Sequence, residues 1–172
     1  VEYVRPFLKG YRVIDALSNV EFYENGLIQH PVPANNHIEP FVEAGVKELW
    51  TYYCTSQWNL VSNRFMHMPS ARNRIMGVLM FKYHIAGFLH WGYNFWYTQF
   101  SKKVIDPYRV TDAGRAFQSG DAFLVYPGDD GPIDSIRHEV FFEAQQDLRA
   151  CQGLAKKIGY EKVLGLLERG LD

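Results

Sequence analysis

The sequence predicts an α/β fold in which short parallel strands alternate with helices. Four short runs are rich in aromatic and β-branched residues and are bounded by turn signals, and stretches with helical periodicity lie between and after them. The runs do not alternate cleanly between apolar and polar residues. Continuous apolar runs of this length are typical of strands that are buried on both faces of a parallel sheet.

The predicted strands cover residues 12–16, 49–54, 88–93 and 122–126. They recur at intervals of about 35 to 40 residues, as expected of successive βα units. A doubly wound sheet would normally carry a glycine-rich phosphate-binding turn after an early strand, and the sequence contains none. A complete (β/α)8 barrel needs roughly 250 residues. We therefore expect residues 1–172 to form a single domain, the C-terminal half of a TIM-type barrel with long loops and without its upstream half.

Two longer helices are marked by end signals and by an apolar stripe. The first is expected to run from Ser70, as N-cap, to Gly87, as a left-handed C-cap. Its stripe consists of Ile75, Val78, Leu79, Tyr83 and Ala86. The second is expected to begin at Asp134-Ser135 and to end at Gly159. Its buried face is expected to consist of Ile136, Val140, Ala144, Leu148, Cys151 and Ala155.

Three further segments complete the expected chain. A short helix covers residues 161–168, and a weaker helical pattern covers residues 38–44. Residues 94–120 show no clean helical pattern, and a loop of that length is usually functional or disordered. The chain begins at Val1 rather than at a methionine, so we expect a fragment or a processed product.

The composition excludes several classes of function. Eighteen basic and nineteen acidic residues give a formal net charge of -1 without a basic run, which argues against nucleic-acid binding. No apolar stretch approaches the roughly 20 residues of a membrane span. The two cysteines fit no metal or redox spacing and are expected to be buried free thiols, and the six histidines show no metal-ligand spacing. We therefore predict no metal and no cofactor.

Candidate binding residues lie at the C-terminal ends of the predicted strands, where a parallel barrel places its site. Aromatic residues make up 16% of the chain, and three of the four tryptophans fall in or just beyond these ends. The substrate-binding candidates are Asp15, Tyr52, Trp91, Asn94, Trp96 and Tyr126. Two interpretations stay open, a ligand-facing aromatic shelf and ordinary core packing of the same rings. Gly92 would allow a ligand or another backbone to approach closely, whereas Asp129-Asp130 is typical of a tight turn.

Five strings add a family resemblance to these patterns. YRVIDALSN, LWTYYCTSQ, NRFMHMPSARNRIMG, GFLHWGYNFW and GDAFLVYPGDDGPIDSIRHE occur in this order and span nearly the whole chain. Together they resemble the C-terminal barrel region shared by glycoside hydrolase family 123 and its uncharacterised relatives, often described as a domain of unknown function. The resemblance implies a (β/α)8 barrel behind an N-terminal β-sandwich. It also implies exo-acting β-N-acetylgalactosaminidase activity on glycans that contain an N-acetylhexosamine.

The resemblance further implies a retaining, substrate-assisted mechanism. In that mechanism the sugar's 2-acetamido oxygen attacks the anomeric carbon, and an adjacent Asp-Glu pair orients the acetamido group and transfers the proton. This sequence contains no Asp-Glu dipeptide. We therefore assign no catalytic residue and expect this chain by itself to be inactive, supplying one wall of a sugar pocket.

One rival class of function and one expected kind of partner follow. The rival class is a non-catalytic carbohydrate-binding or structural module, because fold does not fix activity. Half a barrel exposes strand edges, so we expect self-association or a separate chain that completes the barrel. The residues indicate no compartment, and secretion is expected only from the resemblance to a glycan-degrading enzyme.

Overall fold

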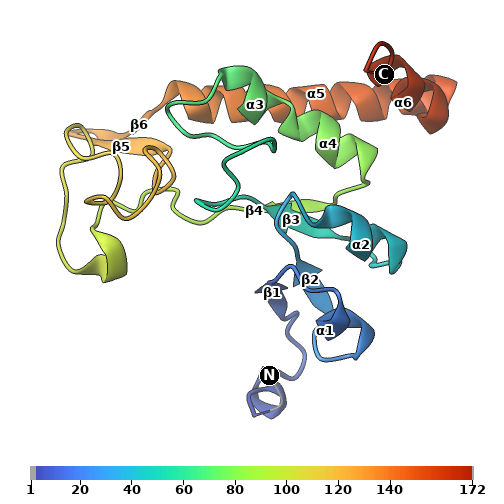
Figure 1. Cartoon of the computed structure of the whole chain (residues 1–172), viewed down its shortest axis with the longest axis horizontal. Coiled ribbons are helices and arrows are strands. Elements are labelled where there is room, and N and C mark those ends of the chain that lie inside the picture. Colours follow the sequence, from blue (N-terminus) through green and yellow to red (C-terminus); the bar gives the residue numbers. More distant parts are fainter. Residues whose placement is uncertain (1–2, 172) are drawn as a thin grey trace.

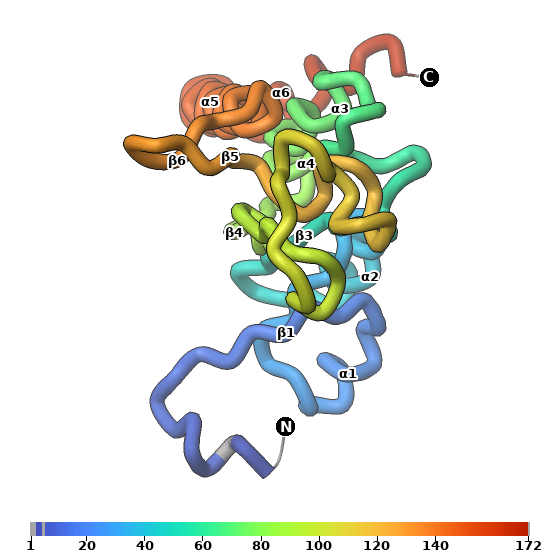
Figure 2. The backbone as a smooth tube through the Cα atoms, turned by 90° about the vertical axis from the view of Figure 1, so that its left-hand side faces the viewer, coloured from blue at the N-terminus to red at the C-terminus, as the bar shows by residue number. Residues whose placement is uncertain are grey.

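The computed structural model describes residues 3–171 and has a mixed α/β architecture with short strands (Figure 1). In chain order the elements are η1 (Arg5–Leu8), β1 (Ile14–Ala16), α1 (Glu21–Glu24), β2 (His30–Val32), α2 (Ile38–Glu43), β3 (Trp50–Tyr52), α3 (Ser70–Arg74), α4 (Met76–Lys82), β4 (Gly87–Leu89), η2 (Gln99–Ser101), β5 (Val125–Gly128), β6 (Gly131–Asp134), α5 (Ile136–Ile158) and α6 (Tyr160–Leu167). In both views α5 and α6 lie on one side of β3 and β4, and β1, β2 and α1 lie on the other (Figures 1 and 2).

Parallel pairing joins the first four strands in the order of the chain. β1 pairs with β2, and β3 pairs with β4, both parallel. A parallel bridge between Ala34 and Tyr52 connects the two pairs just beyond β2. Parallel strands were predicted at three of these places, and β2 was missed because its three residues include Pro31, which cannot donate to a sheet ladder. The structure shows this one series of parallel strands, so the half barrel remains a prediction.

The fourth predicted strand was wrong in its pairing. β5 begins at Val125 and pairs antiparallel with β6, with Gly128 opposite Gly131. The residues between them, Asp129 and Asp130, form the tight turn that the sequence predicts. A two-residue connection can join only antiparallel strands, so the local turn decides the pairing here.

The predicted helix from Ser70 to Gly87 is two helices that end earlier. α3 and α4 meet at Ile75, and α4 ends at Lys82. The chain reverses at His84, which has φ 52°, so the predicted C-cap at Gly87 is wrong. Gly87 instead opens β4, where a Cβ would overlap the indole ring of Trp50.

The predicted stripe of that helix is correct only in part, because Leu79 and Tyr83 pack against the core but Ile75 and Ala86 are exposed. Ile75 is 43% exposed, whereas Met76, Met80 and Phe81 are buried. The predicted stripe and the set of residues that is buried both recur at helical spacing, so the periodicity alone did not identify the buried face of the helix. Gly77 explains which face is inside, because a Cβ there would overlap the backbone of Ala144 in α5. The two helices therefore touch closely along the face that contains Met76 and Met80.

The main apolar core lies between the helices and one face of β3 and β4. Its buried residues are Ile38, Phe41, Leu49, Tyr53, Met76, Met80 and Ile85. The helix predicted over residues 38–44 is α2, which contributes two of them. Phe88, Phe141 and Leu148 pack against the cluster from β4 and α5.

The last two helices follow the prediction closely. α5 begins after Ser135 and ends at Gly159, whose φ of 95° favours glycine. Val140 and Ala144 are buried as predicted, but Ile136 is 70% exposed because the first turn of α5 buries Arg137 instead. Residues 94–120 contain only the short η2 turn, so the predicted lack of a clean helix is confirmed. In the described part of the chain, no helix is long and apolar enough to cross a membrane.

Candidate functional site

The C-terminal ends of the parallel strands are tied together by polar contacts. The hydroxyl of Ser18, just after β1, accepts a hydrogen bond from the backbone N–H of Ala34 at 3.1 Å. The N–H of Asn35 donates to the carbonyl of Tyr52 at 2.8 Å. These contacts continue the strand order at one edge, so the loops after β1, β2 and β3 meet there.

The loop after β3 is held by amide side chains. The side-chain oxygen of Gln57, Oε1, accepts a hydrogen bond from the backbone N–H of Cys54 at 3.0 Å. The side-chain nitrogen of Gln57, Nε2, donates to Asn36 Oδ1 at 3.3 Å. Asn63, which is fully buried, donates to the carbonyls of Cys54 and Gln57 at 2.8 and 2.7 Å. The loop is therefore an ordered part of the edge.

Two segments far apart in sequence form the neighbouring part of this edge. The N–H of Phe95 donates to the carbonyl of Ala122 at 3.0 Å, and the N–H of Leu124 donates to the carbonyl of Tyr93 at 2.8 Å. Gly92 has φ 62°, and a Cβ on it would lie 2.8 Å from the Ala122 carbonyl oxygen. The close approach that the sequence predicts at Gly92 is made by this second backbone.

These two segments carry a cluster of aromatic rings, which we call the aromatic cluster. Around the buried residues Ala113, Ala122 and Phe123 it gathers Trp91, Phe95, Trp96, Phe117 and Tyr126. The ring of Trp91 lies 5.1 Å from that of Phe117 in a T-shaped arrangement and 5.7 Å from that of Phe95. The indole N–H of Trp96 donates to the carbonyl of Val125 at 3.0 Å. Trp91, Trp96 and Tyr126 are each half-buried, so the cluster keeps part of its ring surface open.

The structure brings three of the six sequence candidates into this cluster. Trp91, Trp96 and Tyr126 belong to it, and Asn94 is exposed beside it, bridged to Phe123. Tyr52 is the half-buried last residue of β3 and lies at the same edge of the sheet. Burial raises the pKa of the Tyr52 hydroxyl.

Asp15 lies apart from the other candidates. It is the exposed middle residue of β1, pairs with Pro31, and lines a cavity of about 850 Å³ among residues 4–29. Asp15 therefore lines a cavity made by the N-terminal part of the chain, and no residue of the aromatic cluster lines that cavity.

Behind the aromatic cluster lies a group of buried polar side chains that the sequence did not single out. Arg64 is 1% exposed, and Asp121 is fully buried. The two carboxylate oxygens of Asp121 accept no hydrogen bond from any described residue. The indole N–H of Trp91 is likewise buried, and within residues 3–171 it has no hydrogen-bond partner. Arg64 stands in a loop without any periodic signal, and Asp121 lies at the end of the long segment that shows no clean helix.

Burial dominates the titration of this group. It raises the pKa of Asp121 to about 6, against the opposing effects of the positive charges of Arg64 and Arg137. It lowers the pKa of His90 to about 2, with help from the charges of Arg64 and Arg137, so the imidazole is neutral at pH 7. The pKa of the Tyr53 hydroxyl is raised to about 12 by burial. The Asp121 carboxyl group therefore changes between its protonated and its ionised form in mildly acidic solution.

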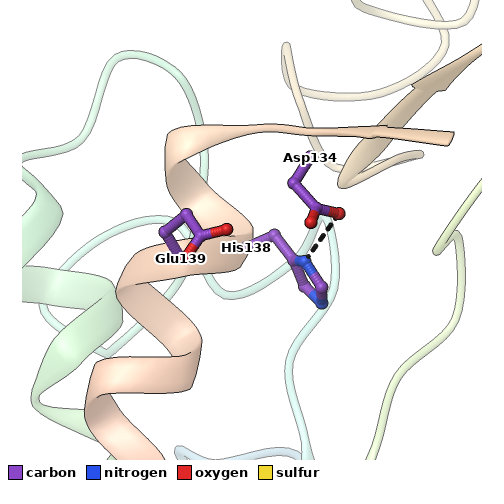
Figure 3. A group of neighbouring side chains, drawn as sticks. All are labelled: Asp134, His138 and Glu139. Carbon is purple, nitrogen blue, oxygen red and sulfur yellow. Dashed lines mark hydrogen bonds and ion pairs between the residues drawn. The ribbon is translucent and has the colours of Figure 1, made fainter. Parts of the chain in front are cut away.

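One group of side chains has the composition of a metal site. Asp134, His138 and Glu139 surround the start of α5, with His138 Nδ1 3.0 Å from Asp134 Oδ1 (Figure 3). The carboxylates are exposed, and the positive end of the helix dipole opposes a cation there. The arrangement is that of an ion pair spaced i,i+4 on the surface, and it supplies no reason to assign a metal.

Comparison with known proteins gives one match. The family model described as "Glycoside hydrolase 123, catalytic domain" matches residues 1–154. Among curated proteins, no sequence matches the chain.

Proposed function

Because the chain belongs to the glycoside hydrolase family 123 catalytic-domain family, we propose that its aromatic cluster forms one wall of a sugar pocket. The family implies a glycoside hydrolase and a carbohydrate substrate. We further propose that the substrate is a terminal β-linked N-acetylhexosamine, with N-acetylgalactosamine preferred. This chain, residues 1–172, is proposed to be the C-terminal part of the barrel.

The observation that carries the proposal is the grouping of Trp91 and Trp96 next to an exposed amide. Sugar rings stack on flat aromatic faces, and both indoles keep part of their surface open at the edge where strand ends meet. Asn94 beside them offers one acceptor and two donors to a hydroxyl or an acetamido group. Tyr52 and Tyr126 add phenol groups at the same edge, whereas Asp15 is the weakest candidate because of its position.

The proposed mechanism is retaining and substrate-assisted. The acetamido oxygen of the substrate attacks the anomeric carbon, the leaving group takes a proton from a carboxylic acid, and water then opens the cyclic intermediate. The chain has no Asp-Glu dipeptide to transfer that proton. Its proposed contribution is to stack and orient the sugar.

Two measurements test this proposal. Ligand-observed NMR on the purified chain should detect N-acetylgalactosamine more strongly than galactose, which lacks the acetamido group. Aryl N-acetyl-β-galactosaminide should be hydrolysed by a longer chain that contains these residues and an upstream Asp-Glu pair, and not by the 172 residues alone. A chain that binds none of these sugars, and a longer chain that hydrolyses none, would refute the proposal.

The missing Asp-Glu pair also supports a second candidate, a non-catalytic carbohydrate-binding module. Binding would then persist without turnover in every chain that contains this domain. The same two measurements separate the candidates, because only the enzyme gains hydrolysis when upstream residues are added.

A further inference from the structure

Arg64 joins the two segments that make the aromatic cluster. Its Nη2 donates to the backbone carbonyl of Trp91 at 3.2 Å and to that of Asp121 at 2.5 Å. These carbonyls stand at the start of the segments 91–97 and 121–126, which are far apart in sequence. One guanidinium group therefore contacts both at the point where each begins.

The guanidinium is itself held from the helix side. Its central carbon lies 5.2 Å from the centroid of the Tyr53 ring. The Tyr53 hydroxyl donates to Asn73 Oδ1 at 2.9 Å, and the Asn73 amide donates to the carbonyl of Arg137 at 2.8 Å. Buried contacts thus run without a break from the first turn of α5, through α3, to the aromatic cluster.

Filling space does not explain an arginine at this position. Arg64 is 1% exposed, and burying a charge is costly even near an opposite charge such as that of Asp121, so an apolar side chain of similar size would pack there at a lower cost. Its Nε and Nη1 have no hydrogen-bond partner among residues 3–171, so saturation of its own donors does not explain it either. What the side chain does supply is one nitrogen, Nη2, which a planar, rigid guanidinium holds within reach of two carbonyls.

We propose that Arg64 is a positioning residue for the sugar-stacking face of Trp91. By fixing the separation of the Trp91 and Asp121 carbonyls, it sets the orientation of the indole in the aromatic cluster, without touching the sugar. This inference rests on the proposed function for its consequence in binding. Its structural content, the orientation of Trp91, is independent of any ligand.

The test uses the full chain in three variants. Arg64→Met removes the donors and keeps an unbranched apolar side chain, and Arg64→Lys keeps the charge on a shorter, flexible side chain without the planar guanidinium. Arg72→Met is the matched control, because Arg72 also donates to two backbone carbonyls, those of Asn59 and Val61, away from the aromatic cluster. Each variant is labelled with 6-fluorotryptophan, and the Trp91 signal is assigned from Trp91→Phe. Fluorine NMR reports the orientation, and titration with N-acetylgalactosamine reports binding.

We expect Arg64→Met to shift the fluorine signal of Trp91 and to leave that of the exposed Trp58 in place. Sugar binding should weaken by up to about tenfold, the loss expected when the stacking face of Trp91 no longer meets the sugar. Arg64→Lys should give an intermediate signal and intermediate binding, and Arg72→Met should change neither. An unshifted Trp91 signal in a folded Arg64 variant would overturn the inference.

Failures of the two proposals are distinguishable. If the unmodified chain binds no sugar, the proposed function fails, and the fluorine signals still decide the role of Arg64. If Arg64→Met does not fold, Arg64→Lys decides it, because a folded lysine variant with the original Trp91 signal and the original affinity would overturn the inference.

Discussion

The helix-covered core and the aromatic cluster each pack around buried residues, yet they are built in different ways. The core around Phe41 and Met76 consists of apolar side chains that meet between helices and strands. The aromatic cluster packs against the buried polar side chains of Arg64 and Asp121. Two nitrogens of Arg64 and both carboxylate oxygens of Asp121 have no hydrogen-bond partner among the described residues. The first arrangement favours stability, and the second fixes the placement of a few rings at some cost in stability.

The largest effect is expected from damage to the core. Phe41→Ala removes a ring that is 0% exposed and leaves a cavity, so the free energy of unfolding should fall by about 3–5 kcal/mol. Denaturation by urea, followed by far-UV circular dichroism, measures the change. If the two regions are separate in function, the fraction that remains folded should bind sugar with unchanged affinity. A lower affinity of the folded fraction would mean that the core and the aromatic cluster are not separate in function.

The next effect comes from the buried carboxyl group beneath the aromatic cluster. The pKa of Asp121 is raised to about 6 in the folded chain, from about 3.9 in an unfolded one. The folded state therefore holds the proton more tightly, so stability is highest below pH 4 for this group and falls as pH rises to 6. The loss is on the order of 2 kcal/mol. Asp121→Asn should abolish this part of the pH dependence in urea denaturation measured from pH 4 to pH 7. An equal slope in both proteins would contradict it.

A smaller effect is expected from the rings themselves. Trp91→Ala should weaken binding of N-acetylgalactosamine about tenfold, or ~1.4 kcal/mol, because it removes a stacking face. Trp58→Ala is the control, since Trp58 is 59% exposed and stands outside the aromatic cluster. Isothermal titration or ligand-observed NMR gives the affinities. Equal affinities of the two variants would favour core packing as the role of Trp91.

The smallest effect concerns a surface ion pair of the helix layer. Lys82 and Glu168 lie 2.7 Å apart, with side chains that are 40% and 41% exposed. Lys82→Met should lower the free energy of unfolding by less than about 1 kcal/mol, because water and salt screen such pairs. Urea denaturation in 1 M salt should show no difference from the unmodified chain. A larger, salt-independent loss would mean that the helix layer also depends on placed charges.

Sequence reasoning succeeded where local signals agree with packing. Ser135 and Gly159 bound α5 as predicted, because cap residues and an apolar stripe point to the same helix. It failed where the deciding contact is distant in sequence. Gly77 against Ala144 selects the inner face of α4, and the turn at Asp129-Asp130 overrides the apolar run before it.

The candidate site divides in the same way. Trp91, Trp96 and Tyr126 could be named in advance, since aromatic residues at strand ends form a visible pattern, and the structure groups them. Their use in binding stays a proposal. The burial of Arg64 and Asp121 could not be predicted from the sequence. A charged residue in a loop is expected to be exposed, and here only the tertiary structure buries it.

Trp50 fills the space beside the point where β3 and β4 begin. Its indole lies over Gly87, the paired residue of β4, where an added Cβ would come within 2.3 Å of the ring. Any other residue at position 87 would therefore force the indole of Trp50 to move, and the first residues of the two strands have to change together.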